Sequence, residues 1–285
     1  MALRPILKWA GSKRLLAETV RRTFDAPPAV YCEPCVGAGW VYVQRLVVGE
    51  LRPGPHVVLA DLNPALMAFY RGLRAAPQEV LGAMADLPWG EGWRQQYGAL
   101  RDAFRSWQPG ADDVATADQA ALFLWLNRAC FNGLFRVSKT GNFNTPAGSY
   151  AVLARPTDHH VMAFAEALAG VQLVCQPFHA TLAGTAAGDQ VYVDPPYFGA
   201  FGDYTSTTWD YRQQVRLALA CSGARVLGAH VVASNADHPK MRALWGSLGF
   251  DVREAHAYHS VGATGARRRQ AGELLLVGAP PRRRR

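Results

Sequence analysis

The chain has 285 residues, a length that allows one large domain or one domain with a sizeable insertion. Hydrophobic residues make up 49% of it, and no apolar run approaches the ~20 residues of a membrane-spanning helix. These values exclude a helical integral membrane protein. The net charge of +8 at pH 7 is compatible with a polyanionic partner, and equally with a solvated basic surface.

Cysteine usage and the first residues both indicate a reducing compartment. The chain has five cysteines, an odd number, and Cys130, Cys175 and Cys221 are isolated, which argues against a disulfide framework. The opening MALRPILKWAGSK lacks the apolar core and the small-residue cleavage site of a signal peptide. We therefore expect a cytoplasmic protein.

The first quarter of the chain has an alternating strand and helix pattern. Residues 29–34 and 56–61 are short apolar runs that predict strands, and residues 41–51 and 62–74 have the composition of helices. A glycine turn separates the first strand from the first helix. This β-α-β-α order predicts a parallel sheet with helices on both faces.

The pattern changes after residue 75. Residues 75–130 contain no convincing strand and predict helices that carry four tryptophans, at positions 89, 93, 107 and 125. Two alternating runs, LFRVS (134–138) and NFNTP (142–146), then flank Lys139-Thr140-Gly141. A glycine between two such runs predicts a β-hairpin.

The α/β pattern returns in the second half. It predicts five further strand segments, a helix over 208–223 and a helix over 239–250. The strand segments are 171–178, 189–197, 224–235 and a closing pair, 251–260 and 272–279. The organisation is therefore a discontinuous α/β domain, residues 1–65 and 149–285, interrupted by a mainly helical insertion at 66–148 that bears the hairpin.

Residues 31–40, YCEPCVGAGW, carry two overlapping signals. Gly37 and Gly39 at a strand-to-helix turn allow close approach of a ligand, and Asp61 ends the next strand 22 residues later, as in nucleotide-binding folds. Tyr42 replaces the third glycine of a dinucleotide fingerprint, so a nucleoside without pyrophosphate, such as S-adenosylmethionine, suits the turn better than a nicotinamide cofactor. A plain tight turn remains the alternative.

The same ten residues contain a C-x-x-C pair, Cys32 and Cys35. A zinc site needs two further ligands at short spacing, and the remaining cysteines are scattered. A redox pair belongs at a helix N-terminus, whereas this pair precedes the glycine turn. We therefore expect no metal, with Cys32 directed into the sheet packing and Cys35 beside the ligand, where Trp40 fills part of the space.

The stretch VYVDPPY (191–197) is the most informative in the chain. An apolar strand ends at Asp194, and Pro195, Pro196 and Tyr197 follow. Ligands of open α/β sheets bind at the carboxyl ends of the strands, so Asp194 should lie on the same edge as the glycine turn. The Asp194 carboxylate and the Pro195 carbonyl can accept the two N–H groups of an exocyclic amine, and Tyr197 offers a face for stacking a flipped base.

These residues resemble the Dam-type DNA adenine-N6 methyltransferases, in which the S-adenosylmethionine motif precedes the catalytic motif. The resemblance covers nearly the whole chain and is carried by six motifs in family order: LKWAGSK (7–13), EPCVGAG (33–39), LADLNP (59–64), NRACFNGLFRVSKTGNFNTPAG (127–148), DPPY (194–197) and RRRQAGELLL (267–276). It implies a Rossmann-like methyltransferase fold with a helical target-recognition insertion.

The resemblance also implies roles for particular residues. Asp194, Pro195, Pro196 and Tyr197 form the catalytic loop. S-adenosylmethionine is the cofactor, with no metal, and the residues implied to bind it are Lys8, Trp9, Ala10, Gly11, Lys13, Pro34, Cys35, Gly37, Gly39, Asp61, Leu62, Phe178 and Asp194.

The hairpin region of the insertion resembles the part of the family that reads DNA. Arg128, Asn132, Arg136 and Lys139 are the implied DNA-binding residues, because a two-stranded ribbon fits the major groove and arginine pairs bidentately with guanine. The expected activity is methyl transfer to adenine N6 in double-stranded DNA, at GATC or another site containing GA. We expect a monomer in solution that can bind DNA in more than one copy.

Three positions depart from the family pattern. Cys35 stands where the family usually has phenylalanine, Trp40 where it has a small residue, and Pro177 where it has an acid. Two alternatives therefore stay open: a methyltransferase that acts on RNA or protein, and a catalytically weak homologue that binds DNA. The exact recognition sequence, a partner restriction enzyme, a cellular or phage origin and processivity are not determined by the sequence.

Overall fold

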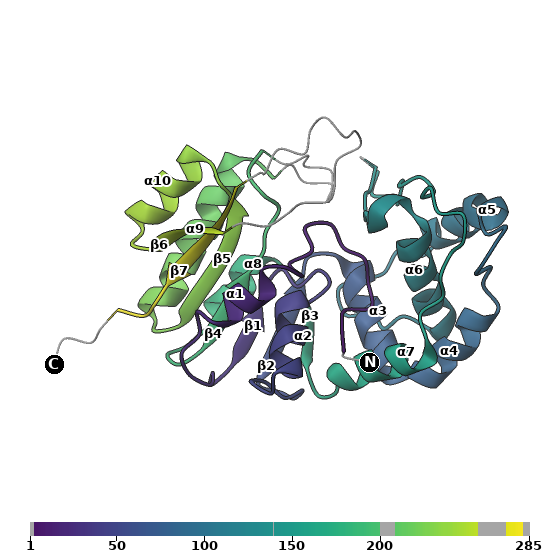
Figure 1. The fold of residues 1–285 in the computed structure, drawn as a ribbon, viewed down its shortest axis with the longest axis horizontal. Helices are drawn as coiled ribbons and strands as arrows, with labels where there is room; N and C mark the ends of the chain where they lie inside the picture. Colours follow the sequence, from purple (N-terminus) through teal and green to yellow (C-terminus); the bar gives the residue numbers. More distant parts are fainter. Residues whose placement is uncertain (1–2, 139, 200–208, 256–271, 282–285) are drawn as a thin grey trace.

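A computed structural model describes residues 3–138, 140–199, 209–255 and 272–281. Its described residues form one seven-stranded sheet in the order β3-β2-β1-β4-β5-β7-β6 (Figure 1). The strands are β1 (Tyr31–Glu33), β2 (Val57–Asp61), β3 (Gln172–Cys175), β4 (Gln190–Val193), β5 (His230–Ala236), β6 (Asp251–Ala255) and β7 (Glu273–Gly278).

Five strands are parallel, and β7 enters antiparallel between β5 and β6. The strand order reverses direction at β1, which lies between β2 and β4; Cys32 pairs with Val58 on one side and Val191 on the other. Such a reversal opens a crevice at the carboxyl ends of the strands, where ligands of α/β sheets bind. The glycine turn after β1 and the Asp194 loop after β4 both lie there.

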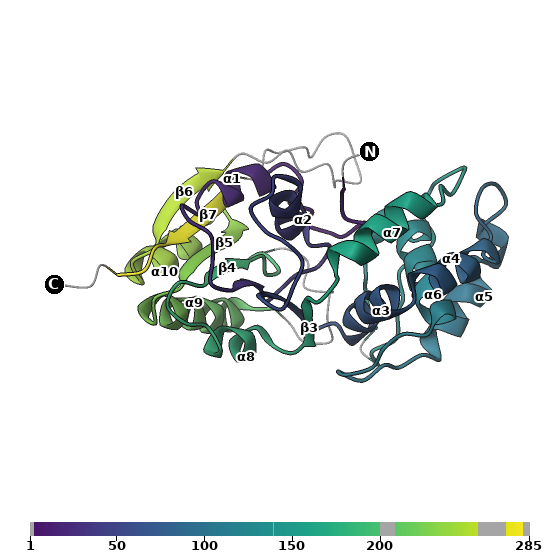
Figure 2. The ribbon, with the colours of Figure 1, turned by 90° about the horizontal axis from the view of Figure 1, so that it is seen from below.

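Helices cover both faces of the sheet, as the alternating pattern predicts (Figure 2). One face packs against α1 (Ala17–Arg21), α2 (Trp40–Val47) and α3 (Pro64–Ala75) through the larger of two hydrophobic clusters. The other face packs against α8 (Phe178–Ala183), α9 (Tyr211–Val226) and α10 (Pro239–Ser247). The strands divide by alternation: Tyr192 faces the first cluster, whereas Val191 and Val193 face the second.

Residues 77–133 form a helical unit whose core is continuous with that of the sheet. It contains α4 (Pro77–Ala85), α5 (Arg94–Arg105), α6 (Ala117–Ala129) and the short 3₁₀ helix η1 (Phe131–Gly133), and α7 (Asp158–Ala167) packs against α4. Trp93 and Trp125 are fully buried in the larger cluster together with Leu59 of the sheet. The tryptophans at 93 and 125 are thus core residues, and those at 89 and 107 pack against the same cluster.

The predicted hairpin is present in reduced form. Val137 and Phe143 form an isolated antiparallel bridge, and Ser138 N–H donates to the Asn142 carbonyl oxygen at 2.8 Å. Gly141 has a φ of 82°, the left-handed conformation that a tight turn requires. Lys139 lies outside the described residues.

The prediction of a strand over 224–235 is wrong in its first half. Helix α9 continues to Val226, and β5 begins only at His230. The buried residues Leu217, Ala218, Cys221 and Ala224 follow helical spacing. The apolar residues that suggested a strand, Val226 and Leu227, are instead 65% and 59% exposed at the end of the helix.

The N-terminal segment runs between the sheet and the helical unit (Figure 1). The Asn127 side chain holds it by two hydrogen bonds: Lys8 N–H donates to Asn127 Oδ1 at 2.9 Å, and Asn127 Nδ2 donates to the Lys8 carbonyl at 2.6 Å. Gly133 lies so close that a Cβ there would be 2.4 Å from Lys8 Cβ. No helix in the described part of the chain has the length and apolar character to cross a membrane.

Candidate active site

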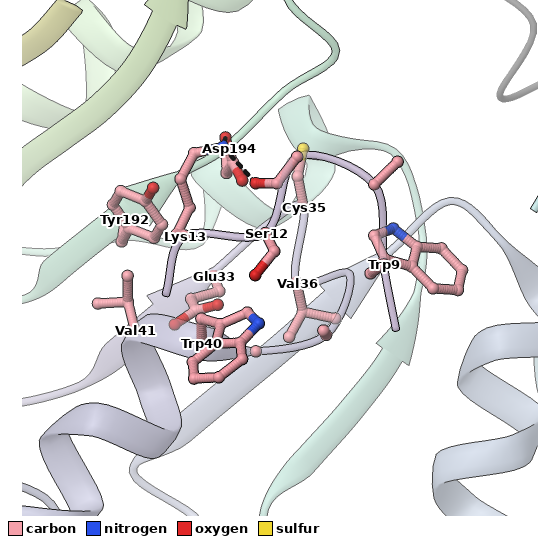
Figure 3. A pocket seen from close by; sticks show the side chains of 14 residues that line it. Trp9, Ser12, Lys13, Glu33, Cys35, Val36, Trp40, Val41, Tyr192 and Asp194 are labelled. Atoms are coloured by element: carbon pink, nitrogen blue, oxygen red, sulfur yellow. Dashed lines mark hydrogen bonds and ion pairs between the residues drawn. The ribbon is translucent and has the colours of Figure 1, made fainter. Parts of the chain in front are cut away.

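A recess of about 290 Å³ lies at the carboxyl ends of β1 and β4 (Figure 3). The N-terminal segment, the glycine turn and the end of β4 form its walls. Its lining residues are Trp9, Ala10, Gly11, Ser12, Lys13, Glu33, Cys35, Val36, Ala38, Gly39, Trp40, Val41, Tyr192 and Asp194.

The glycine turn is fixed by Asp61, at the end of the neighbouring strand β2. Gly37 and Gly39 have φ values of 47° and 70°, and Gly39 is the N-cap of α2. Gly37 N–H donates to Asp61 Oδ2 at 3.1 Å, and Asn63 N–H donates to Asp61 Oδ1 at 3.0 Å. Burial raises the pKa of Asp61, while these backbone donors oppose the shift. The turn and the acid that the sequence paired at this edge are therefore in direct contact.

Lys13 is the central cation of the site. Its side chain is 4% exposed, and its Nζ lies 2.9 Å from Asp194 Oδ1 and 3.5 Å from Glu273 Oε1. The same Nζ donates to the Gly11 carbonyl at 2.5 Å and lies 4.7 Å from the centre of the Tyr197 ring. Tyr197 in turn donates its hydroxyl to Glu273 Oε1. Lys13 thus connects the N-terminal segment, the Asp194 loop and strand β7.

The acids around the recess have raised pKa values. Burial raises the pKa of Glu33 to about 8 and that of Glu273 to about 7, and the nearby Asp194 carboxylate adds to both shifts. Burial also raises the pKa of Asp194, although the Lys13 ammonium opposes it. Lys13 is the only lysine or arginine among the described lining residues. The lining therefore combines two acids, Glu33 and Asp194, with the single cation Lys13.

The two cysteines of the C-x-x-C pair differ in their surroundings, as expected. Cys32 is buried in the smaller hydrophobic cluster, and Cys35 lines the recess. Burial raises the pKa of both thiols, so they stay protonated at neutral pH. Trp40 is half-buried and lines the same recess as Cys35, which agrees with the expectation that it occupies space there.

The structure brings together seven of the residues predicted to bind the cofactor and places six outside the recess lining. Those in the lining are Trp9, Ala10, Gly11, Lys13, Cys35, Gly39 and Asp194. Gly37 is in the glycine turn, and Asp61, the last residue of β2, accepts its N–H. Phe178, at the start of α8, packs edge-on against Trp209 at 5.8 Å. The remaining three are Lys8, whose Nζ lies over the Tyr150 ring at 4.1 Å, Pro34 and the exposed Leu62.

The predicted DNA-binding residues have different environments. Asn132 is exposed, with a left-handed φ of 54°. Arg136 donates from Nε to Asn144 Oδ1 at 2.7 Å across the hairpin, which orients its guanidinium. Arg128 donates from Nη2 to the Ile6 carbonyl at 2.6 Å, and thereby holds the N-terminal segment. The fourth, Lys139, is outside the described residues.

Several residues of the site were not singled out from the sequence. Glu33, Ser12 and Tyr192 line the recess, and Glu273 contacts both Lys13 and Tyr197. Glu33 and Glu273 lie in two of the family motifs, EPCVGAG and RRRQAGELLL, and an acid beside an apolar run is the sequence pattern that could have identified them. Ser12 and Tyr192 carry no such signal.

The fold and the site together define a methyltransferase. The sheet order with an antiparallel β7, the glycine turn after β1 and the Asp-Pro-Pro-Tyr loop after β4 are the features expected of a Rossmann-like methyltransferase that acts on an amine. The predicted fold class is confirmed.

Comparison with known proteins identifies the family. The D12 class of N6 adenine-specific DNA methyltransferases matches residues 9–261, and the chain belongs to this family. It is 31% identical over 284 residues to a DNA adenine methylase of Vibrio cholerae, with 97% of this chain and 96% of that protein covered. It is 28% identical over 295 residues to a type II methyltransferase of Methanocaldococcus jannaschii, with 97% and 99% covered.

A phage relative is much longer. The chain is 31% identical over 279 residues to a DNA N-6-adenine-methyltransferase of Escherichia phage P1, with 96% of this chain covered. The chain spans 35% of that protein's length. The predicted enzyme class, an adenine-specific DNA methyltransferase, is confirmed by the family and by these relatives.

Proposed function

We propose that the enzyme transfers a methyl group from S-adenosylmethionine to adenine N6 in double-stranded DNA, and that the residues of the recess and the Asp194 loop carry out the reaction. One observation supports this most directly. Asp194, which begins the loop, lies in the wall of the recess, 2.9 Å from Lys13. An amine held by the loop and a ligand in the recess would therefore meet.

The composition of the recess fits S-adenosylmethionine. The raised pKa values of Glu33 and Asp194 mean that two acids share a buried site with insufficient compensating charge, and a sulfonium or ammonium group would relieve this. Each oxygen of Asp61 accepts one backbone N–H and keeps a lone pair that can accept a hydroxyl. Trp9, Gly11 and the glycine turn would hold the remainder. When bound, S-adenosylmethionine supplies an electrophilic methyl group on sulfur.

The Asp194 loop would bind and orient the adenine amine. The Asp194 carboxylate accepts one N–H and the Pro195 carbonyl accepts the other, and both bonds draw the nitrogen lone pair out of conjugation with the ring. Lys13 keeps Asp194 ionised, because an adjacent ammonium favours the charged carboxylate. Tyr197 stacks on the flipped base and offsets part of the cost of removing it from the duplex.

The hairpin of the insertion would select the DNA site. Arg136 is oriented by Asn144, and a guanidinium in a fixed plane can pair bidentately with guanine in the major groove. We propose GATC, or another site containing GA, as the target, and a cytoplasmic enzyme that is monomeric in solution. Phosphate contacts near Asn132 would position the hairpin without reading sequence.

Single-molecule sequencing of DNA that the purified protein has methylated tests this proposal, because it reports the modified base and its context together. We expect N6-methyladenine within one short motif. Asp194→Ala should abolish methylation while DNA binding in a gel-shift assay is largely retained. Label from tritiated S-adenosylmethionine in RNA or protein, with none in DNA, would contradict the proposal, and so would full activity of the Asp194→Ala variant.

A further inference from the structure

Two buried amide side chains, Gln214 and Asn235, form hydrogen bonds with the Asp194 loop and with each other, and we call this pair the amide clamp. Gln214 on α9 and Asn235 on β5 are both 0% exposed, although neither is part of the recess lining. Gln214 Nε2 donates to the Pro196 carbonyl at 2.9 Å, and Asn235 Oδ1 accepts from the Phe198 backbone N–H at 3.2 Å. The two amides are joined to each other, since Asn235 Nδ2 donates to Gln214 Oε1 at 2.8 Å.

The loop needs support of this kind because of its own sequence. Pro195 and Pro196 have no N–H, so this stretch cannot be held by donating backbone hydrogen bonds to a neighbouring strand. The Pro196 carbonyl and the Phe198 N–H lie on either side of Tyr197 in the chain, and the amide pair forms a hydrogen bond with each of them. Tyr197, which lies between them, is held separately through its hydroxyl by Glu273.

The chain of bonds also fixes the orientation of each amide. Gln214 gives its donor to Pro196, so only its oxygen is directed at Asn235, and Asn235 must present its own donor to that oxygen. The Asn235 oxygen is then directed at Phe198 N–H and also accepts Ala236 N–H at 2.9 Å. Because a buried amide without hydrogen-bond partners is unfavourable, the loop carbonyl and N–H are held in the positions where all these bonds form together.

We propose that Gln214 and Asn235 are positioning residues that fix the conformation of the catalytic loop, and thereby aim the Pro195 carbonyl and the Asp194 carboxylate at the substrate amine. This inference rests on the proposed function of that loop. Neither amide touches the recess, so their loss should act on the orientation of the loop and leave cofactor binding intact.

The test compares Gln214→Met with Gln190→Met, a matched control. Gln190 is a buried amide at the opposite end of β4, and its Nε2 donates to the Ala26 carbonyl, so both variants lose a hydrogen bond from a buried amide to a backbone carbonyl. Misplacement of reacting groups by about 1 Å costs ~100-fold in rate. We expect kcat to fall by about 10-fold to 100-fold in Gln214→Met with the S-adenosylmethionine Kd and the DNA KM changed less than about 3-fold, and kcat of Gln190→Met to stay within about 2-fold.

Hydrogen exchange gives a readout that does not depend on activity. The peptide containing the Phe198 N–H should exchange at least about 10-fold faster in Gln214→Met than in the wild type or in Gln190→Met, because its acceptor Asn235 is no longer held. If Gln214→Met does not fold, the double variant Gln214→Met/Asn235→Leu serves, because it also removes the Asn235 donor that the single substitution leaves buried without a partner.

The outcomes separate this inference from the proposed function. If Gln214→Met shows unchanged exchange at Phe198, or a kcat equal to that of Gln190→Met, the proposed positioning role of the two amides is overturned, even if the wild-type enzyme methylates adenine. A loss confined to the Kd of S-adenosylmethionine also overturns it, since that would place the amides in cofactor binding. A wild type that modifies no adenine contradicts the proposed function, whereas faster exchange in Gln214→Met would still support the clamp.

Discussion

Gly37→Ala tests whether the glycine turn and Trp9 form one unit. Gly37 has a φ of 47°, and a Cβ there would lie 2.8 Å from Trp9 Cδ1 and 3.0 Å from Trp9 Nε1. Gly39 supplies the matched control: its φ is 70°, and the nearest heavy atom to its Cβ would be Val36 Cγ2 at an ordinary 3.5 Å. Both substitutions place alanine in the left-handed region, but only Gly37→Ala must displace the indole.

The two costs can be estimated separately. An L-residue in the left-handed region costs roughly 1–2 kcal/mol, and this applies to both variants. Trp9 also stacks on Phe135 of the hairpin, with ring centres 6.1 Å apart and an interplanar angle of 19°, and such a pair contributes roughly 0.5–1.5 kcal/mol. We therefore expect Gly39→Ala to lose about 1–2 kcal/mol of unfolding free energy and Gly37→Ala about 1.5–3.5 kcal/mol.

The assay is urea unfolding followed by far-ultraviolet circular dichroism, with calorimetric titration of S-adenosylmethionine. Both substitutions are measured in the wild-type background and in Trp9→Ala. The extra cost of Gly37→Ala should vanish when Trp9 is absent, and its loss of S-adenosylmethionine affinity should exceed that of Gly39→Ala by about tenfold, which is ~1.4 kcal/mol. An equal cost of Gly37→Ala in both backgrounds would refute the reasoning.

Three further predictions follow from the charges of the site and the insertion. Glu33, with a pKa raised to about 8, binds a proton more tightly in the folded protein, so the unfolding free energy of the wild type should fall relative to Glu33→Gln as pH rises from about 4.5 to about 8; parallel pH curves in urea would contradict this. Lys13→Met should move the rising limb of the kcat–pH profile to higher pH, because Lys13 lowers the pKa of Asp194; an unmoved limb would argue against that pairing. Arg136→Met should relax specificity at one base at a cost of roughly 1–3 kcal/mol, whereas Arg128→Met should mainly reduce stability; gel shifts on single-base variants of the site, together with urea unfolding, distinguish the two, and an unchanged site preference in Arg136→Met would contradict the first.

The sequence predicted the parts of the molecule that local patterns determine. Short apolar runs located β1, β2 and β4, because a strand buried on both faces has a continuous apolar sequence. The same argument misplaced the start of β5, since Val226 and Leu227 are apolar but lie exposed at the end of a helix. Composition alone could not separate an exposed helix end from a buried strand.

The residues of the functional site were likewise predicted only where a local sequence pattern marks them. The glycine turn, Asp61 and the Asp194 loop were found because each is a local spacing of unusual residue types. Gln214 and Asn235 were missed because their role depends on contacts across 21 residues of sequence with each other, and the link from Tyr197 to Glu273 spans 76. No local pattern distinguishes a buried amide that holds a distant carbonyl from one on a solvated surface.

The way the N-terminal segment is held has a consequence for the order of folding during synthesis. Lys8 is bonded to Asn127, 119 residues later, and Lys13 lies against Glu273 in the last described strand. At ribosomal rates of ~5–20 residues per second, Lys8 emerges about 6–24 s before Asn127. Lys8 and Lys13 therefore remain without these two partners while the intervening residues are synthesised. Lys13 cannot acquire its ion pair with Glu273 until β7 has been made, so the part of the recess that Lys13 forms should reach its final geometry only after that strand has been synthesised.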